Sequence, residues 1–203
     1  YPYTAASTNL ASALFNEGFQ DRLGVDYGDL EWALTGERLN AETFADYRKR
    51  GGWVIIHMMN ADNVRKAVAR PDIIIASDGV PFVNGRAHPR GAGSFSRVLG
   101  RYVREEQALS LMDALRKMTL LPAQRLEPTV PQMRDKGRIR PGADADITIF
   151  DPATVIDRAT FAEPAQPSAG IIHVLVAGTF VVRDAQFKEG VYPGQPILRA
   201  VTR

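Results

Sequence analysis

The order of three short segments within residues 53–75 constrains the fold of this chain more than any other feature. An apolar run at residues 53–58 is typical of a strand, and residues 61–69, preceded by Asn60 as an N-cap, predict a helix. The β-branched run Ile-Ile-Ile at residues 73–75 then predicts a second strand, buried on both faces. A strand, a helix and a strand in this order are typical of a βα unit with a parallel sheet, so we expect an α/β protein.

Composition narrows the class of protein. With 203 residues, of which 45% are hydrophobic, the chain has the size of one or two globular domains. Its net charge of +2 reflects nearly balanced acids and bases, so we expect no nucleic-acid partner. No apolar run approaches the roughly 20 residues that span a bilayer, so we expect no membrane partner. The lack of cysteine excludes disulfides and thiolate metal sites within this chain, and we expect a cytoplasmic location.

The pattern of the sequence changes near residue 128. Before it, Ser110 followed by Asp113 predicts the start of an amphipathic helix, and residues 121–126 predict a second short one. After it, helical periodicity gives way to short β-rich runs, and residues 171–187 predict a hairpin around Ala177-Gly178. We therefore expect an α/β part at residues 1–130 and a small β domain at residues 131–203.

A carboxylate directly after an apolar strand is the first candidate for chemistry. Asp78 follows the isoleucine run in the sequence Ala-Ser-Asp-Gly. Burying such a charge is costly unless a metal, a proton or a cation compensates it, and parallel α/β folds carry their chemistry at strand ends. Asp-Gly is also a common turn pair, so a plain turn residue is the competing interpretation.

Several motifs together resemble a known family. They are "SDG" at residues 77–79, "HPRGAGSFSRVLGRYVREE" at 88–106, "KGRIRPGADADITIFDP" at 136–152 and "DRATF" at 157–161. In this order they resemble the amidohydrolase superfamily, and in particular its D-aminoacylase branch, the N-acyl-D-amino-acid deacylases. The resemblance covers nearly the whole chain, including the segment "YPYTAAST" at its start.

The resemblance implies both a fold and a reaction. The implied fold is the C-terminal part of a (β/α)₈ TIM barrel carrying a small β-sandwich. The implied reaction is hydrolysis of the linear amide of an N-acyl-D-amino acid, a small-molecule substrate. The implied cofactor is a divalent metal, usually zinc, which lowers the pKa of a bound water to about 7 and polarises the amide carbonyl.

The resemblance also assigns roles to four residues. Asp78 corresponds to the carboxylate that moves the proton from water to the leaving nitrogen and that contacts the metal. Arg90 corresponds to the arginine that binds the substrate α-carboxylate, in a loop rich in glycine. Tyr1 and Ser7 correspond to residues that line the substrate pocket. A surface arginine, and strand-end or cap roles for Tyr1 and Ser7, are the competing interpretations.

One departure from the family pattern is as informative as the match. The family's His-x-His pair, its metal-bridging cysteine and two further histidines precede the "YPY" segment, and none lies in this chain. His57, His88 and His173 do not occupy those positions, so we expect structural roles for them, as for Asp144 and Asp146. We expect that the N-terminal half of the barrel is missing, and that the chain alone neither binds zinc nor catalyses the reaction.

Two further functions compete with the deacylase. A cyclic-amide hydrolase of the dihydroorotase or hydantoinase type would keep the superfamily and change the substrate, although the "HPRG" sequence at residues 88–91 favours the deacylases. A non-catalytic fragment that lacks the metal-binding half is the third interpretation.

Overall fold

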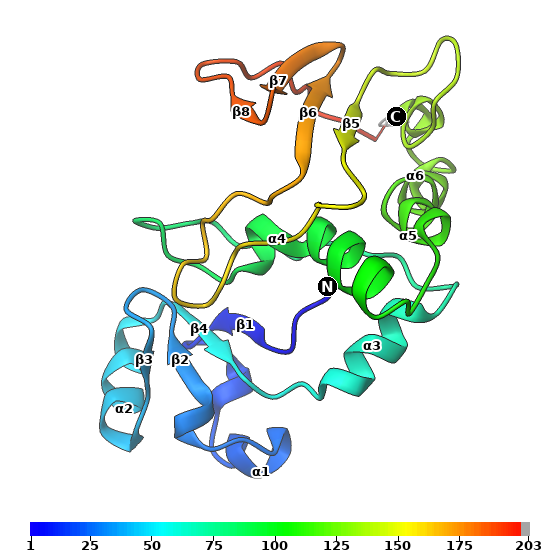
Figure 1. The fold of residues 1–203 in the computed structure, drawn as a ribbon. Helices are drawn as coiled ribbons and strands as arrows, with labels where there is room; N and C mark the ends of the chain where they lie inside the picture. Colours follow the sequence, from blue (N-terminus) through cyan, green and yellow to red (C-terminus); the bar gives the residue numbers. More distant parts are fainter. Residues whose placement is uncertain (200–203) are drawn as a thin grey trace. The chain divides into compact units, whose positions relative to one another are not determined.

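The computed structural model describes residues 1–199. The chain divides into two compact units. The first unit contains residues 1–67, 77–94 and 158–167, and the second contains the remaining described residues. Both units mix helices with a sheet, so the expected α/β class is confirmed (Figure 1). Whether the domains of the protein divide near residue 130 stays a prediction.

The first unit is built on a sheet of four antiparallel strands. They are β1 (Ala6–Asn9), β2 (Leu30–Trp32), β3 (Glu37–Arg38) and β4 (Trp53–Ile56), in the spatial order β1-β4-β2-β3. Ile56 lies opposite Ala6 on one side and Leu30 on the other, which places β4 in the interior of the sheet. The predicted strand at residues 53–58 is therefore confirmed over its first four residues.

Aromatic and aliphatic side chains from the insert between β1 and β4 cover this sheet. Besides β2 and β3, the insert forms α1 (Phe19–Leu23), α2 (Ala41–Arg50) and two 3-10 turns, Ala13–Phe15 and Tyr27–Asp29. The rings of Phe19 and Phe44 stack at 5.0 Å. The buried cluster consists of Leu10, Phe15, Phe19, Val25, Leu30, Trp32, Leu39, Phe44, Val54 and Ile56. Burial of so many large apolar groups makes this cluster the main stabilising element of the first unit.

The segment that follows β4 departs from the sequence-based prediction. Helix α3 (Ala61–Ala69) is present, and the Asn60 side chain accepts from the Asp62 amide, which confirms the predicted N-cap. Residues 73–75, however, form no strand, and Ile74 is 37% exposed. The strand pairs of residues 1–199 are all antiparallel, so the expected parallel βα pairing does not form there. An extended segment is a strand only when a neighbour completes its hydrogen bonds.

The helices of the second unit follow one another closely. Helix α4 (Arg90–Arg97) starts in the first unit and continues as a π-helix at Val98–Glu105. Helices α5 (Leu111–Met118) and α6 (Leu120–Leu126) and a 3-10 turn at Pro131–Asp135 come next. As predicted, Ser110 caps α5 by accepting from the Asp113 amide at 3.1 Å. Gly100 is required where it stands, because a Cβ there would lie 2.5 Å from the Val155 carbonyl oxygen.

The second sheet follows these helices. It contains β5 (Ile147–Phe150), β6 (Ile171–Val176), β7 (Thr179–Arg183) and β8 (Gln186–Phe187), antiparallel and in sequence order. The predicted hairpin forms between β6 and β7. Ala177 and Gly178 both have positive φ, 48° and 78°, as a two-residue type I′ turn requires.

A membrane-spanning helix needs a minimum length and an apolar character. Among the helices of residues 1–199, none combines the length and the apolar character needed to cross a bilayer.

Candidate active site

Asp78 has a left-handed backbone conformation, and its side chain contacts a cation. Its φ of 50° is in the left-handed region, which aspartate tolerates better than most residues. Its carboxylate oxygen Oδ2 lies 2.9 Å from the Nη2 atom of Arg90, and its side chain is 62% exposed. Strained residues with a charged partner are frequent at functional sites. The carboxylate is thus both compensated and accessible to a ligand.

Arg90 is the buried partner of that carboxylate. Its side chain is 2% exposed, and its Nε donates to the backbone carbonyl of Asp78 at 2.7 Å. The structure places it as the first residue of α4. The predicted placement of Arg90 in a glycine-rich loop is therefore wrong, and so is the alternative of a surface arginine. The Ser94 hydroxyl donates to the Arg90 carbonyl at 2.8 Å, which ties the first turn of the helix together.

Two of the predicted site residues carry buried polar atoms without a hydrogen-bond partner. They are Nη1 of Arg90 and Oγ of Ser7; within residues 1–199 the Oγ atom of Ser12, which was not a predicted site residue, is in the same state. A buried donor without a partner costs about 1–3 kcal/mol, so each such group needs an explanation. Nη1 of Arg90 and Oγ of Ser7 both carry a hydrogen to donate. A ligand with acceptor oxygens would therefore satisfy both atoms.

Tyr1 forms a second wall of the Arg90 site. The guanidinium carbon of Arg90 lies 4.4 Å from the centre of the Tyr1 ring, within the range of a cation–π interaction. Burial raises the pKa of the Tyr1 phenol, and the positive charge of Arg90 opposes this rise. The phenol therefore stays protonated at neutral pH and is able to donate a hydrogen bond. Ser7 lies on β1 opposite Ile55.

His88 connects these elements. The side chain has no exposed surface. Its Nε2 lies 2.9 Å from the Ala5 carbonyl oxygen, and its Nδ1 accepts from the Arg90 amide at 3.0 Å. Burial, and after it the charge of Arg90, lowers the pKa of His88 to about 3. The structural role expected for this histidine thus takes a definite form, a neutral link between two segments.

Sequence reasoning missed a second pair close to β4. His57, which follows the strand, has its Nε2 2.9 Å from Oε2 of Glu31, a buried residue of β2. The ring of Phe161 packs at 4.7 Å on His57 and at 5.2 Å on His88. Phe161 belongs to the "DRATF" motif, which was the available signal for its importance. Nothing in the sequence pairs Glu31 with His57, because they lie 26 positions apart.

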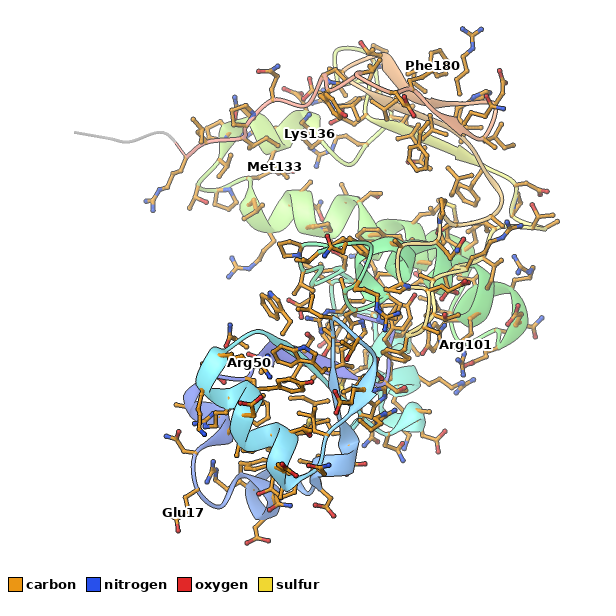
Figure 2. The ribbon with its side chains drawn as sticks, turned by 90° about the vertical axis from the view of Figure 1, so that its left-hand side faces the viewer. Glu17, Arg50, Arg101, Met133, Lys136 and Phe180 are labelled. Atoms are coloured by element: carbon orange, nitrogen blue, oxygen red, sulfur yellow. The ribbon has the colours of Figure 1, made fainter. Side chains whose placement is uncertain are left out.

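The acidic residues of the second unit have other partners. Lys136, labelled in Figure 2, lies 2.9 Å from Asp144 Oδ2 and 2.5 Å from Asp146 Oδ2. Asp146 also accepts from the Ala177 amide in the β6–β7 hairpin. His173 on β6 accepts from the Asp184 amide through Nδ1. These contacts agree with structural roles for Asp144, Asp146 and His173.

The described residues do not form a metal site. Within residues 1–199, no three His, Cys, Asp or Glu side chains are grouped so that they could hold an ion. Asp78, the predicted metal contact, has Arg90 as its charged neighbour. A zinc centre takes about three or four protein ligands, and the described residues do not bring such a set together.

The helices and sheets make this an α/β protein, and the buried Arg90 guanidinium beside the accessible Asp78 carboxylate is its candidate anion-binding and acid–base site. The model of the Amidohydrolase family matches residues 24–182. Among curated relatives from Alcaligenes xylosoxydans xylosoxydans, an N-acyl-D-glutamate deacylase is 36% identical over 91% of this chain. A D-aminoacylase from the same organism is 39% identical over 98% of this chain.

Solved structures agree with these relatives. An N-acyl-D-glutamate deacylase from Bordetella bronchiseptica, solved with zinc and a phosphonate inhibitor that mimics the tetrahedral intermediate, superposes with a TM-score of 0.79. It is 35% identical, and the match covers 98% of this chain and 42% of that one. A D-aminoacylase structure is 34% identical over 93% of this chain and 40% of its own, with a TM-score of 0.74.

The chain belongs to the amidohydrolase family. It spans about two fifths of the length of the relatives that it matches, 38% of the N-acyl-D-glutamate deacylase and 41% of the D-aminoacylase. The predicted fold class, part of a deacylase barrel protein, is confirmed by these matches.

Proposed function

We propose that the protein to which this chain belongs is a metal-dependent hydrolase that removes the acyl group from N-acyl-D-amino acids. One observation carries the proposal, the buried Arg90 guanidinium with a partnerless Nη1 beside the exposed carboxylate of Asp78. A substrate of this class presents a carboxylate that does not react and an amide that does. The site offers one group for each, a cation for the carboxylate and a base for the amide.

Arg90 is suited to bind the α-carboxylate of the substrate. Its Nη1 atom is buried and lacks an acceptor, so a carboxylate oxygen that reached it would form a charge-assisted hydrogen bond. Ser7 Oγ and the Tyr1 phenol would supply further hydrogen bonds. These roles for Arg90, Ser7 and Tyr1 follow the family resemblance together with the contacts around Arg90.

A bidentate grip on the substrate requires one exchange of partners. Nε of Arg90 already donates to the Asp78 carbonyl, and Nη2 lies against the Asp78 carboxylate. A substrate carboxylate that takes both Nη1 and Nη2 therefore displaces the Asp78 side chain. The displaced carboxylate is then free to accept a proton from water and to pass it to the leaving nitrogen.

Zinc, in this proposal, is contacted by Asp78 and otherwise held by the family residues that precede the "YPY" segment. When bound, it supplies an activated water and polarises the amide carbonyl. The 203-residue chain by itself stays predicted to be inactive, and the cytoplasmic location expected from the sequence likewise stays a prediction.

Replacing Asp78 by Asn in the full-length protein tests the base. Asparagine keeps the size of the side chain and tolerates the left-handed backbone, but it cannot accept the proton. We expect kcat for an N-acyl-D-amino acid to fall at least about 100-fold. Asp184→Asn is a matched control, because Asp184 also has a positive φ, 52°, but belongs to the second unit. Near-normal turnover of metal-loaded Asp78→Asn would refute the role of Asp78.

Replacing Arg90 by Lys in the full-length protein tests whether Arg90 binds the substrate α-carboxylate. Lysine keeps the charge but loses the planar fork of donors. We expect kcat/KM for an N-acyl-D-amino acid to fall by about 1.5–3 kcal/mol in transition-state free energy. An N-acyl amine without a carboxylate should be affected far less. Equal losses on both substrates would mean that Arg90 supports the fold of the site instead.

Assays of the full-length wild-type protein with both kinds of substrate decide whether it is a cyclic-amide hydrolase. Hydrolysis of a dihydroorotate-type or hydantoin-type ring in preference to every N-acyl-D-amino acid would replace the proposal. No contact among the described residues favours the ring substrate.

A further inference from the structure

His88 makes two hydrogen bonds to two segments that are far apart in the sequence. Its Nδ1 faces the amide of Arg90 at 3.0 Å, and its Nε2 faces the carbonyl of Ala5 at 2.9 Å. Arg90 carries the guanidinium of the candidate site. Ala5 lies between Tyr1 and Ser7, the other two residues assigned to the substrate carboxylate. One imidazole therefore joins the two parts of that site.

The directions of these bonds determine which tautomer is present. The Arg90 amide can only donate, so Nδ1 must be an acceptor without a proton. The Ala5 carbonyl can only accept, so Nε2 must carry the proton and donate it. The imidazolium form would point an N–H group at the Arg90 amide. Both neighbours therefore favour the neutral Nε2–H tautomer.

The ring is held in place from several sides. Tyr3 packs edge-on at 5.6 Å, Phe161 at 5.2 Å and Tyr1 at 6.2 Å from the centre of the imidazole. Pro89, directly after it, is fully buried. A side chain so enclosed keeps one rotamer, and its two hydrogen bonds are satisfied in that rotamer.

We propose that His88 is a positioning residue whose neutral Nε2–H tautomer joins Arg90 to the Tyr1–Ser7 segment (residues 1–7). Through this link, Arg90 and the segment bind the substrate carboxylate together. The inference rests on the proposed function. The bond to the Arg90 amide fixes where α4 begins and where the Arg90 side chain leaves the backbone. The bond to Ala5 places Tyr1 and Ser7 at a set distance from that side chain.

Two substitutions in the full-length protein separate the two bonds. Asparagine places an acceptor near the position of Nδ1, so His88→Asn keeps the bond to Arg90 and loses the bond to Ala5. Glutamine reaches the position of Nε2 with its NH₂ group, so His88→Gln keeps the bond to Ala5 and leaves the Arg90 amide without an acceptor.

The expected signature is a rise in KM that depends on the substrate carboxylate. For an N-acyl-D-amino acid we expect KM to rise about tenfold in His88→Gln, the range for one buried donor left unpaired, and less in His88→Asn. For both variants kcat and the KM of an N-acyl amine without a carboxylate should change less than about twofold, since the proposal places neither bond on the reacting amide.

His173→Gln is the matched control. His173 also accepts a backbone amide through Nδ1, that of Asp184 at 3.1 Å, but it lies on β6 of the second unit. Its replacement should leave the KM of the N-acyl-D-amino acid unchanged. If the His88 variants weaken both substrates equally, or neither, His88 has no positioning role and the inference is wrong.

The tautomer supplies a test that does not need activity. In the wild-type full-length protein, ¹⁵N chemical shifts of His88 should show a protonated Nε2 and an unprotonated Nδ1 at pH 5. An Nδ1–H tautomer or an imidazolium at that pH would overturn the inference. If the wild-type enzyme hydrolyses no N-acyl-D-amino acid, the proposed function fails, and the ¹⁵N shifts still decide whether His88 joins the two segments.

Discussion

The two sheets of the protein are similar in size and opposite in burial. In the first unit the three last residues of β4, Val54, Ile55 and Ile56, are at most 1% exposed. In the second unit no residue of β5 to β8 is buried, and Ile149 and Phe187 are 44% and 68% exposed. Both sheets have four antiparallel strands. Strand pairing alone therefore does not produce a core.

The difference shows where each unit obtains its stability. A sheet is stable when another layer covers its apolar face, and in the first unit the insert between β1 and β4 provides that layer. In the second unit the packed residues are mainly in or beside helices, such as Val98, Ala114 and Val155, each at most 1% exposed. The candidate site, with its buried Arg90 and His88, belongs to the unit with the covered sheet. Such a rigid scaffold is what a site of defined geometry requires.

The same substitution in both sheets should have very different effects. Ile55→Ala, at a position 1% exposed, should lower the free energy of unfolding of the first unit by about 2–5 kcal/mol. Ile149→Ala in β5, at a position 44% exposed, should cost about 0.5 kcal/mol or less. Trp32 and Trp53, the two tryptophans, both lie in the first unit, so denaturant unfolding followed by their fluorescence reports on it. Amide exchange in β6 reports on the second sheet. Equal losses of stability in Ile55→Ala and Ile149→Ala would contradict the difference in burial between the two sheets.

Acid should weaken the first unit before the second. His88 has its pKa lowered by burial from 6.5 to about 3, so the unfolded chain binds a proton that the folded protein does not. Its contribution to stability is complete above pH 6.5 and is lost as the pH falls toward 3. Between pH 6.5 and 4.5 we expect a loss of about 2–3 kcal/mol, measured by tryptophan fluorescence in denaturant.

His88→Gln is the control for this pH dependence and should flatten it. In the second unit, the hydrogen bond from Lys136 lowers the pKa of Asp146 below 3.8, so its contribution is complete above pH 3.8 and is lost only at lower pH. A first unit whose stability is the same at pH 6.5 and 4.5 would contradict the buried neutral state of His88.

A glycine substitution tests the packed helical part of the second unit. The methyl group of Gly100→Ala would collide with the Ile156 side chain and with the Val155 carbonyl, which is backbone and cannot move aside easily. We expect a loss of about 1–3 kcal/mol, measured by amide exchange in the helix at Val98–Glu105. Gly28→Ala in the first unit meets no atom within 4 Å and should change stability by about 0.5 kcal/mol or less.

The smallest effect is expected in the β6–β7 hairpin. Asp146→Ala removes the acceptor of the Ala177 amide and one partner of Lys136, whereas Asp146→Asn keeps an oxygen for the amide. We expect less than about 1 kcal/mol from the exposed ion pair. The Ala177 amide should exchange faster in the alanine variant than in the asparagine variant. Identical exchange in both would mean that the backbone turn, without Asp146, holds the hairpin.

Local features were predictable from the sequence. Asn60 and Ser110 cap their helices as predicted, and Ala177-Gly178 forms the predicted turn. Each of these depends on residues within four positions of one another, so the chain encodes it directly. The family was also recognisable from short motifs. The predicted strand at residues 73–75 was wrong because strand formation requires a partner that the three isoleucines do not specify.

The sequence by itself determined the family, the helix caps, the hairpin and the choice of Asp78 and Arg90 as separate candidate site residues. Only the tertiary structure decided that Arg90 is buried at the start of α4, that His88 joins it to Ala5, and that Glu31 meets His57. These contacts link residues from 26 to 83 positions apart. Such pairs form only when packing brings distant segments together, because neither residue type nor local spacing specifies which donor meets which acceptor.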